Sequence, residues 1–588
     1  MTGASGSRVR IGGPQAAASG DVAALRWVRI LDGRTALTRQ QLGGKAYSIN
    51  WMRTLGLAVP PAATLITEAY ATLDSRGELP AAVWREIREA IAWLEQHTGR
   101  TFGGGPRPLL VSVRSGAAES MPGMMDTILN LGINDHTSRL MAADSGNEDF
   151  ARETLGLFRE QYRRQIGGGP GNRPSALAAA GDGVPEDVWA QLEGAVDAVL
   201  ASWNSPRARA YRQHYQLDER AGTSVTIQAM VFGNFPTASG SGVLFSRNPG
   251  SGEAEPYGQW LPCVQGEDIV SGRRDPEPIT TLARAMPALY QELVDAAGRL
   301  EAEARDVQDI EFTIERGRLW LLQARSAKRS PRAAVNFAVQ LAEQGLISRS
   351  EALTRVTAGQ VRQLLRPGLD ASALLRARVV ASGEPACPGL AHGTVVTSAD
   401  DALDREAEGL VLARPTTSPD DIHGMLAARA IVTELGGATS HAAVVSREIG
   451  VPCIVGCGQG ALLPLAGQAV TVDGASGQVY AGNLPVVRFS EDSDPGLATL
   501  IAWAAVLSPL KVLGLDEPAA DGAVDALVVD AGLAGRLGAL AREGAGAKGA
   551  AMETPEGIRE AVAVGLGTVF VSQRLPALLA AIRACSPA

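Results

Sequence analysis

A histidine stands at the start of a predicted helix in the segment ELGGATSHAAVVSREIGVPCIVG, residues 434–456. The preceding ARAIVTE is apolar enough for a buried strand, two glycines allow a tight turn, and Thr439 or Ser440 can cap the helix. His441 is therefore expected where unpaired backbone N–H groups and the helix dipole favour an anion. A neutral imidazole nitrogen there can attack a phosphoryl group, and the same donors can hold the phosphohistidine. A histidine that merely packs at a helix start is the competing interpretation.

Two acids, an amide and an arginine recur along QDIEFTIERGRLWLLQAR, residues 308–325. The period-two pattern places Asp309 and Glu311 on one face of a strand. A three-residue loop around Gly317 would set Glu311 opposite Gln323 and Asp309 opposite Arg325. Oxygen ligands at this spacing can hold Mg²⁺ shared with substrate phosphates, and the arginine can neutralise those phosphates. A solvated hairpin face with ordinary cross-strand ion pairs is the alternative interpretation.

Two further basic residues are candidates for phosphate binding. Arg114 lies in SVRSGAAESMPGMMDTILNLG, residues 112–132, where a strand delivers the arginine and nearby glycines let the backbone approach a ligand closely. The methionines of MPGMM can equally fill an apolar core. Lys45 follows two glycines in GGKAYSI, where it can reach a phosphate or be an ordinary surface lysine.

The elements that must position these residues divide the chain into several domains, because 588 residues are too many for one hydrophobic core. Proline and glycine in ASGEPACPG and GNLPVVRFSEDSDPG predict hinges on both sides of a compact unit. We expect a disordered leader over 1–20, a mixed α/β region over 21–330, a helical connector over 331–385, a compact α/β unit over 386–482 and a short βα segment over 483–588.

Composition and charge exclude several functional classes. The chain has 54 basic and 63 acidic residues, a net charge of −9, and no basic block, so we expect neither nucleic acid nor a membrane surface as a partner. Five scattered cysteines predict reduced packing residues of a cytoplasmic protein and argue against a zinc site. No run reaches the ~18 apolar residues of a membrane span, and the N-terminus lacks the apolar core of a signal peptide.

Taken together, these stretches resemble the pyruvate, phosphate dikinase family of phosphoenolpyruvate-utilising enzymes. The resemblance covers residues 40–485 and implies an α/β and α+β multidomain protein, with an ATP-grasp-like domain over 21–330 and a swivelling phosphohistidine domain over 386–482. The family's C-terminal (β/α)₈ barrel needs about 250 residues, more than follow Gly482. The segments that carry the resemblance are LGGKAYSI, SVRSGAAESMPGMMDTILNLG, SVTIQAMVFGN, SGSGVLFSRNPGSGE, LPCVQGEDIVSG, DIEFTIERGRLWLLQARSAKR, TTSPDDIHGM and GGATSHAAVVSREIGVPCIVGCG.

The resemblance implies a role for each matching position. His441 matches the phosphohistidine, and Thr439 matches the threonine two residues before it. The nucleotide, phosphate and metal ligands would be Lys45, Arg114, Gln228, Glu267, Asp309, Glu311, Gln323 and Arg325, with Mg²⁺ held by Asp309, Glu311 and Gln323. Three positions depart from the family pattern or match it only faintly, namely Ala46 in place of a glycine, Glu553 as a remnant of a barrel metal ligand, and Cys585 in a tail.

The expected function is that of a phosphotransferase which uses ATP and orthophosphate to phosphorylate His441, releasing AMP and pyrophosphate. The variant RSGAAESMPGMMDT favours orthophosphate as co-substrate. The phosphoryl group would then pass to pyruvate or another small-molecule acceptor. One alternative is a dikinase-derived transferase that serves a different small molecule, or a partner protein that supplies the acceptor site in trans. The other is a non-catalytic, ATP-binding regulatory subunit.

Overall fold

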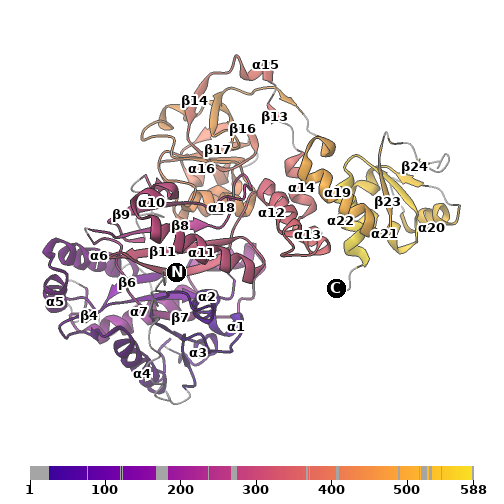
Figure 1. Cartoon of the computed structure of the whole chain (residues 1–588). Helices are drawn as coiled ribbons and strands as arrows, with labels where there is room; N and C mark the ends of the chain where they lie inside the picture. Colours follow the sequence, from indigo (N-terminus) through magenta and orange to yellow (C-terminus); the bar gives the residue numbers. More distant parts are fainter. Residues whose placement is uncertain are drawn as a thin grey trace, which may run out of the picture.

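The structure, a computed structural model, describes residues 25–585 except 76, 120, 122–123, 167–182, 236, 267–274, 366–367, 370, 406–408, 488–489, 516, 518–525, 529–532 and 544–545. Helices and sheets alternate along the chain, which confirms the mixed α/β, multidomain class expected from the sequence. Figure 1 shows two sheets and their helices at the N-terminal end, a further sheet above them, and a helical region that leads to the C-terminal strands. The predicted leader over 1–20 lies outside the described residues.

The first sheet is antiparallel and packs one face into a large apolar core. Val111 and Val113 pack into the core formed with α4, α6 and α7, whereas Ser112 and Arg114 lie on the opposite face. In spatial order its strands are β1 (Val28–Ile30), β2 (Ala62–Leu65), β7 (Ser224–Ala229), β5 (Val111–Gly116) and β6 (Thr127–Leu131). The surrounding elements are α1 (Arg39–Leu42), α2 (Gly44–Thr54), α3 (Thr67–Tyr70), α4 (Ala81–Thr98), β3 (Thr101–Phe102), β4 (Pro108–Leu109), α5 (Asp135–Ser145), α6 (Glu148–Ile166), α7 (Val188–Ser202) and α8 (Pro206–His214).

The second sheet is also antiparallel, and strict alternation along β11 gives it one apolar and one polar face. Ile310, Phe312 and Ile314 pack into the core beneath α11, so Asp309 and Glu311 lie on the other face. In spatial order the strands are β10 (Glu277–Pro278), β9 (Tyr257–Pro262), β8 (Gly240–Phe245), β11 (Gln308–Glu315) and β12 (Arg318–Ser326). The helices of this part are α10 (Ile279–Ala285) and α11 (Pro287–Ala304).

The predicted connector helices share one hydrophobic core with the C-terminal segment. This core joins α12 (Pro331–Glu343), α13 (Arg349–Arg355) and α14 (Ala358–Leu364) to α19 (Pro495–Leu507) and α22 (Arg574–Cys585). The described C-terminal strands form a parallel sheet in the order β23 (Lys511–Gly514), β26 (Thr568–Val571), β25 (Gly546–Lys548) and β24 (Ala526–Val528). Two more helices, α20 (Leu533–Glu543) and α21 (Pro555–Ala563), complete this βα segment.

The compact unit that carries His441 is built on an eight-stranded sheet with a parallel centre. Its strands, in spatial order, are β14 (Val379–Ser382), β21 (Gln478–Ala481), β20 (Ala469–Asp473), β16 (Leu390–Val396), β17 (Leu410–Arg414), β18 (Ala430–Thr433), β19 (Cys453–Val455) and β15 (Glu384–Cys387). The helices are α16 (Ala399–Asp404), α17 (Ile422–Ala427) and α18 (His441–Ile449). The segment predicted as the first hinge therefore differs from the prediction, because β15 pairs with β19 inside this sheet.

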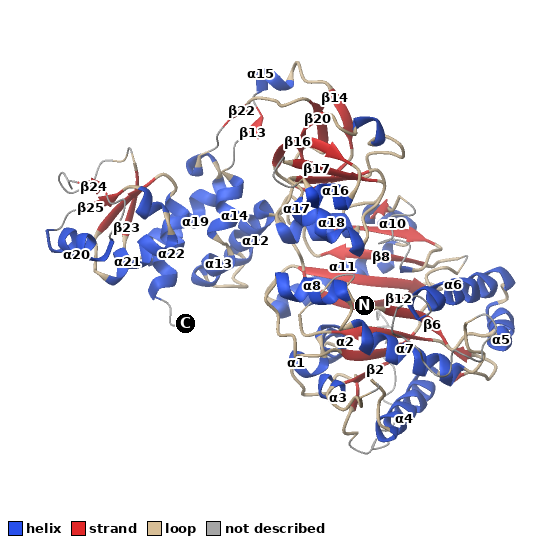
Figure 2. Ribbon diagram, turned by 180° about the vertical axis from the view of Figure 1, so that it is seen from behind, coloured by secondary structure: helices blue, strands red, loops and turns tan. Residues whose placement is uncertain are grey.

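The chain enters and leaves this sheet through segments that touch each other. On the way in, α15 (Ala371–Leu374) follows the short strand β13 (Gly368–Leu369), which pairs with β22 (Val486–Val487) on the way out. Figure 2 shows this pair between the eight-stranded sheet and the connector helices. The two connections thus form one antiparallel ribbon. In the described part of the chain, no helix combines the length and the apolar character needed to cross a membrane.

Candidate functional site

The hairpin of β11 and β12 delivers the acids, the amide and the arginine that the sequence analysis singled out. Its turn has two residues, Arg316 and Gly317, both with positive φ (50° and 74°), and not the three predicted. Further along β12 the register shifts by one residue, because Leu322 has no partner on β11. This bulge compensates for the shorter turn, so the predicted cross-strand pairs form, Glu311 with Gln323 and Asp309 with Arg325.

The bulge also decides which face the side chains of β12 occupy. Before it, Leu319 and Leu321 pack in the core beneath α11. After it, Ala324 is the core residue, and Gln323 and Arg325 lie on the polar face of the sheet. Unbroken alternation would have placed Gln323 and Arg325 on the same side as the two leucines, inside the apolar core.

Arg114 joins these residues from the first sheet. Its Nη2 atom donates to Oε1 of Gln323 at 3.1 Å and lies 3.4 Å from Oε2 of Glu311. Arg325 donates from Nε to Oδ2 of Asp309 at 2.8 Å. Asp309 is buried, and its second oxygen, Oδ1, has no hydrogen-bond partner among the described residues. Basic groups and acidic oxygens thus face one another where the two sheets meet, an arrangement that can receive a phosphate together with a metal ion.

Lys45 lies in the first turn of α2, beside the same groups. Gly43 precedes it with φ 76°, and a Cβ at that position would lie 1.9 Å from a carbonyl oxygen of β5, so the loop needs glycine to pack there. Burial and the charge of Arg114 lower the pKa of Lys45 to about 7. The charge of Arg325 acts in the same direction, and the Glu311 carboxylate opposes both. The free site therefore holds a lysine that is half neutral near pH 7.

The other positions named from the resemblance differ in what the structure says of them. Gln228 is buried on β7 opposite Ser112, on the same face of the first sheet as Arg114, and its Nε2 donates to the Pro60 carbonyl at 3.4 Å. Glu267 lies outside the described residues. Ala46, which replaces a glycine of the family pattern, is fully buried in the core between α2 and the second sheet.

The helix that carries the histidine begins without a side-chain cap. α18 starts at His441 with Ser440 as its N-cap residue, but the Ser440 hydroxyl is buried without a partner among the described residues. The Thr439 hydroxyl donates to Gln259 of β9 at 3.1 Å. The prediction that either hydroxyl caps the helix is therefore wrong, and the first N–H groups of α18 carry no side-chain acceptor that could compete with an anion.

Of the two imidazole nitrogens of His441, one has a hydrogen-bond partner and the other has none among the described residues. Its Nδ1 lies 3.3 Å from the hydroxyl oxygen of Thr417. Its Nε2 is buried and has no hydrogen-bond partner among the described residues. Burial lowers the pKa of His441, and the nearby Asp421 carboxylate only partly opposes this shift. The ring is thus neutral at pH 7, with a nitrogen lone pair available for nucleophilic attack.

The histidine helix lies over the polar face of the second sheet. Glu448, near the end of α18, accepts a hydrogen bond from Lys328 Nζ at 2.8 Å, just after β12. Arg447 lies over the ring of Phe245 on β8, with its Cζ atom 5.8 Å from the ring centroid. Figure 2 shows α18 between the sheet of its own unit and the strands of the second sheet. His441 and the cluster around Arg114 thus belong to parts of the chain that pack together.

Several residues that contact the histidine or its loop were not predicted from the sequence. Thr417 and Asp421 belong to TTSPDDIHGM, one of the segments that carry the resemblance. Its hydroxyl and carboxylate side chains are the feature from which a contact with the histidine could have been predicted. Gln259 and Glu384 carry no local signal, because their roles arise from contacts between distant parts of the chain.

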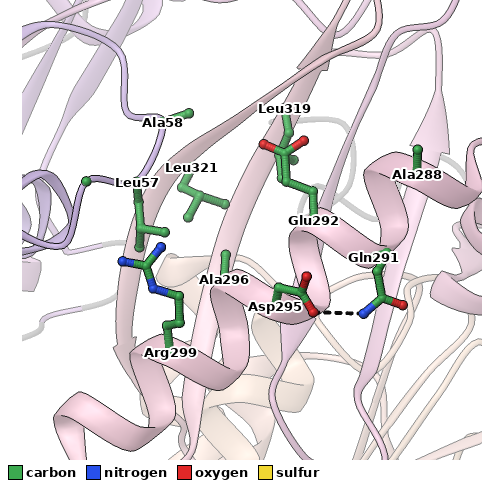
Figure 3. A pocket seen from close by; sticks show the side chains of 11 residues that line it. Leu57, Ala58, Ala288, Gln291, Glu292, Asp295, Ala296, Arg299, Leu319 and Leu321 are labelled. Atoms are coloured by element: carbon green, nitrogen blue, oxygen red, sulfur yellow. Dashed lines mark hydrogen bonds between the residues drawn. The ribbon is translucent and has the colours of Figure 1, made fainter. Parts of the chain in front are cut away.

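A cavity of about 430 Å³ lies on the other face of the second sheet. Figure 3 shows the polar side chains along α11, where Gln291 donates to Asp295 at 2.8 Å, opposite Leu319 and Leu321 of β12. These leucines precede the bulge and face away from Gln323 and Arg325. The cavity is therefore separate from the residues that contact His441.

Two antiparallel sheets with basic and acidic groups between them, joined to an α/β unit with a histidine at a helix start, define an ATP-grasp-like fold class with a further α/β domain. Sequence profiles support this class. The profile of the pyruvate phosphate dikinase AMP/ATP-binding domain matches residues 75–292, and that of the PEP-utilising enzyme mobile domain matches residues 406–477. The chain belongs to the pyruvate, phosphate dikinase family.

Curated relatives match most of the chain. It is 40% identical over 547 residues to pyruvate, phosphate dikinase of Rhizobium meliloti (strain 1021), a match that covers 83% of this chain and 60% of the relative. Identity is 38% over 536 residues with the Clostridium symbiosum protein, covering 83% and 61%. It is 39% over 523 residues with the chloroplastic protein 1 of Zea mays, covering 81% and 55%. The chain thus spans a little over half the length of these relatives.

The lowered pKa of Lys45 predicts that binding of a triphosphate takes up a proton. Phosphate charge raises the lysine pKa in the complex, so above pH 7 the bound amine gains the proton that the free amine lacks. Affinity for ATP should therefore fall as the pH rises above about 7. Isothermal titration calorimetry of ATP binding in buffers of different ionisation enthalpy measures this uptake.

Lys45→Arg should abolish the proton uptake, because a guanidinium stays charged. Lys511→Arg, at an exposed lysine on β23, is the matched control and should leave it unchanged. Equal uptake by the Lys45→Arg protein would show that another group titrates.

Proposed function

We propose that this chain transfers a phosphoryl group from ATP to His441, in the manner of a pyruvate, phosphate dikinase. One observation carries the proposal, namely that the Nε2 atom of His441 is buried and has no partner among the described residues, at the uncapped start of α18. This helix packs on the sheet that also presents Glu311 and Gln323. A nucleophile and a phosphate-binding cluster therefore share one face of the molecule.

The cluster fits ATP together with Mg²⁺. Lys45, Arg114 and Arg325 supply the positive charges that phosphate oxygens need. Asp309, Glu311 and Gln323 would supply hard oxygen ligands, and Oδ1 of Asp309, buried without a hydrogen-bond partner among the described residues, is suited to bind a cation. Magnesium bound there would neutralise charge on the phosphates. The glutamine contributes a neutral oxygen, so the set does not accumulate as much negative charge as three carboxylates would.

The chemical step follows from the imidazole's environment. The Nε2 lone pair forms a bond to the β-phosphorus of ATP, and the bond from that phosphorus to the bridging oxygen of the α-phosphate breaks, so that this oxygen leaves with AMP. An oxygen of orthophosphate then forms a bond to the γ-phosphorus, and the bond from the γ-phosphorus to the oxygen that bridges it to the β-phosphorus breaks. Pyrophosphate leaves, and the β-phosphoryl group stays on Nε2. The reaction requires the imidazole proton on Nδ1, where the Thr417 oxygen lies close enough to accept a hydrogen bond. Arg114 and Arg325 stabilise the charge that develops on the phosphoryl oxygens.

The acceptor in the second half-reaction is proposed to be a small molecule such as pyruvate. The names of the relatives support pyruvate and orthophosphate as substrates. The Glu553 carboxylate, named as a remnant of a metal ligand, accepts bonds from the N–H and hydroxyl of Ser572 at 2.7 and 2.9 Å, so its oxygens are already engaged. A partner protein that supplies the acceptor site in trans remains the second possibility for this step. None of the five cysteines forms a disulfide, which supports the proposed cytoplasmic location.

Histidine labelling tests the proposal directly. Incubation with orthophosphate and ATP labelled on the β-phosphate should place acid-labile, base-stable label on the protein, because that phosphoryl group is the one transferred. His441→Ala should abolish the label, whereas His423→Ala, at another histidine of the same unit that pairs with Asp400, should keep it. Full labelling of the His441→Ala protein would refute the carrier role.

Removal of the Glu311 carboxylate should stop the nucleotide reaction without unfolding the chain. We expect Glu311→Ala to lower AMP formation by roughly 100-fold or more, because a ligand of the metal and a partner of Arg114 are lost together. Glu303→Ala, at an exposed glutamate of α11, is the control and should form AMP at the normal rate. The assignment of the metal site fails if Glu311→Ala matches that control.

A further inference from the structure

Two side chains of β9 reach from the second sheet to the loop in front of His441. Gln259 is 7% exposed, and its amide makes two different bonds. Its Oε1 accepts from the Thr439 hydroxyl at 3.1 Å, and its Nε2 donates to Oε2 of Glu384 at 3.0 Å. Tyr257, two residues earlier on the same face of β9, donates its hydroxyl proton to Oε1 of the same glutamate.

Glu384 links these bonds to the backbone of the histidine loop. It stands at the start of β15, the edge strand of the unit that carries α18. The oxygen that accepts from Gln259 also accepts from the backbone N–H of Ala438 at 3.0 Å. One carboxylate therefore connects the second sheet to a residue only three positions before His441.

The fit around the Gln259 amide is close. A Cβ on Gly437 would lie 2.4 Å from both Nε2 and Oε1 of Gln259, so glycine leaves the space that the amide occupies. The φ of this glycine is not positive, so its role here is to leave room and not to permit a turn. The loop from Gly437 to Thr439 is therefore matched to Gln259 by shape as well as by hydrogen bonds.

We propose that Gln259 and Glu384 are positioning residues that hold the 437–439 loop, and so fix the direction of His441, while its unit is docked on the second sheet. The inference rests on the proposed function for its catalytic consequence, because docking serves phosphorylation of His441. Neither residue belongs to the cluster around Arg114. They set where the nucleophile stands and leave nucleotide binding to other residues.

Because one side chain is neutral and the other is charged, Gln259 and Glu384 cannot be substituted independently of each other. A neutral amide at 259 is required, because it must donate to one neighbour and accept from the other. In Gln259→Glu, two carboxylates would meet at hydrogen-bond distance and repel. Adding Glu384→Gln removes the repulsion, since the new amide at 384 can donate to the carboxylate at 259, which still accepts from Thr439. The rescue is partial, because the Ala438 N–H then faces an amide NH₂ group in place of the carboxylate oxygen that accepted from it.

A second contact of the docked unit serves as an independent reporter. Glu448 on α18 accepts from Lys328 Nζ at 2.8 Å and from the Tyr211 hydroxyl at 3.3 Å, both outside its own unit. The chain has only four lysines, at 45, 328, 511 and 548. A carbodiimide can join the Lys328 amine to the Glu448 carboxylate, and mass spectrometry of the peptides identifies this crosslink without any engineered residue.

The first test measures docking of the full-length chain without any reaction. Gln259→Glu should lower the yield of the Lys328–Glu448 crosslink at least roughly fivefold, and the double variant with Glu384→Gln should recover part of it. Gln291→Ala, at the glutamine of α11 on the far face of the same sheet, should crosslink like the unmodified chain. An unchanged yield in Gln259→Glu would overturn the docking role, whether or not the chain phosphorylates His441.

The second test measures the reaction in a single turnover with β-labelled ATP. We expect Gln259→Glu to slow labelling of His441 by roughly 100-fold with an unchanged dissociation constant for Mg-ATP, and the double variant to regain at least tenfold of that loss. A variant that is merely misfolded would lose ATP binding as well and would not be rescued. If docking changes but the labelling rate does not, the positioning role is refuted. If the unmodified chain takes no label, the proposed function fails, while the crosslink still decides whether this pair controls docking.

Discussion

The candidate site depends on one extra residue in β12. The bulge at Leu322 rotates the rest of the strand by half a period, so that leucines before it fill the core and Gln323 and Arg325 after it meet Glu311 and Asp309. The same sheet can thereby bury an apolar face under α11 and present a ligand set on the other side. Without the bulge, the amide and guanidinium would have to be desolvated in the core, which is costly for polar groups without partners.

The contact between the histidine unit and the second sheet is mainly polar and made of few bonds. Ion pairs and hydrogen bonds join Glu384 and Glu448 to the second sheet and its neighbours, while Ile422 of α17 packs on the small apolar cluster around Met124 and Trp203. A hydrogen bond to a carboxylate contributes about 1.5–3 kcal/mol net, because water offers replacement partners. A contact of this kind can form with one defined geometry and still separate on the time scale of a reaction, as small polar interfaces between domains commonly do.

Local pattern was sufficient to predict which residues of the hairpin lie opposite one another but not what surrounds them. The cross-strand pairs of the hairpin were predicted correctly although the turn was not, because a shorter turn and the bulge shift the register in opposite directions. Periodicity cannot locate a bulge, since LWLLQAR also reads as an unbroken strand. Gln259 and Glu384 are 125 positions apart, so no local signal could join them. The predicted cap at Thr439 failed for the same reason, because its hydroxyl bonds to Gln259, which is 180 positions away.

The ribbon of β13 and β22 has a kinetic consequence. Both connections of the histidine unit run through the antiparallel ribbon of β13 and β22. The unit therefore stays tied to its own chain, at an effective concentration on the order of millimolar near the second sheet. Its encounters with the second sheet are then first-order in protein, so dilution does not slow them. The same unit supplied as a separate molecule would need a concentration on the order of millimolar to meet the sheet as often. The covalent link therefore allows the contact to be weak, with a dissociation constant approaching the millimolar range, and still form in a large fraction of the molecules.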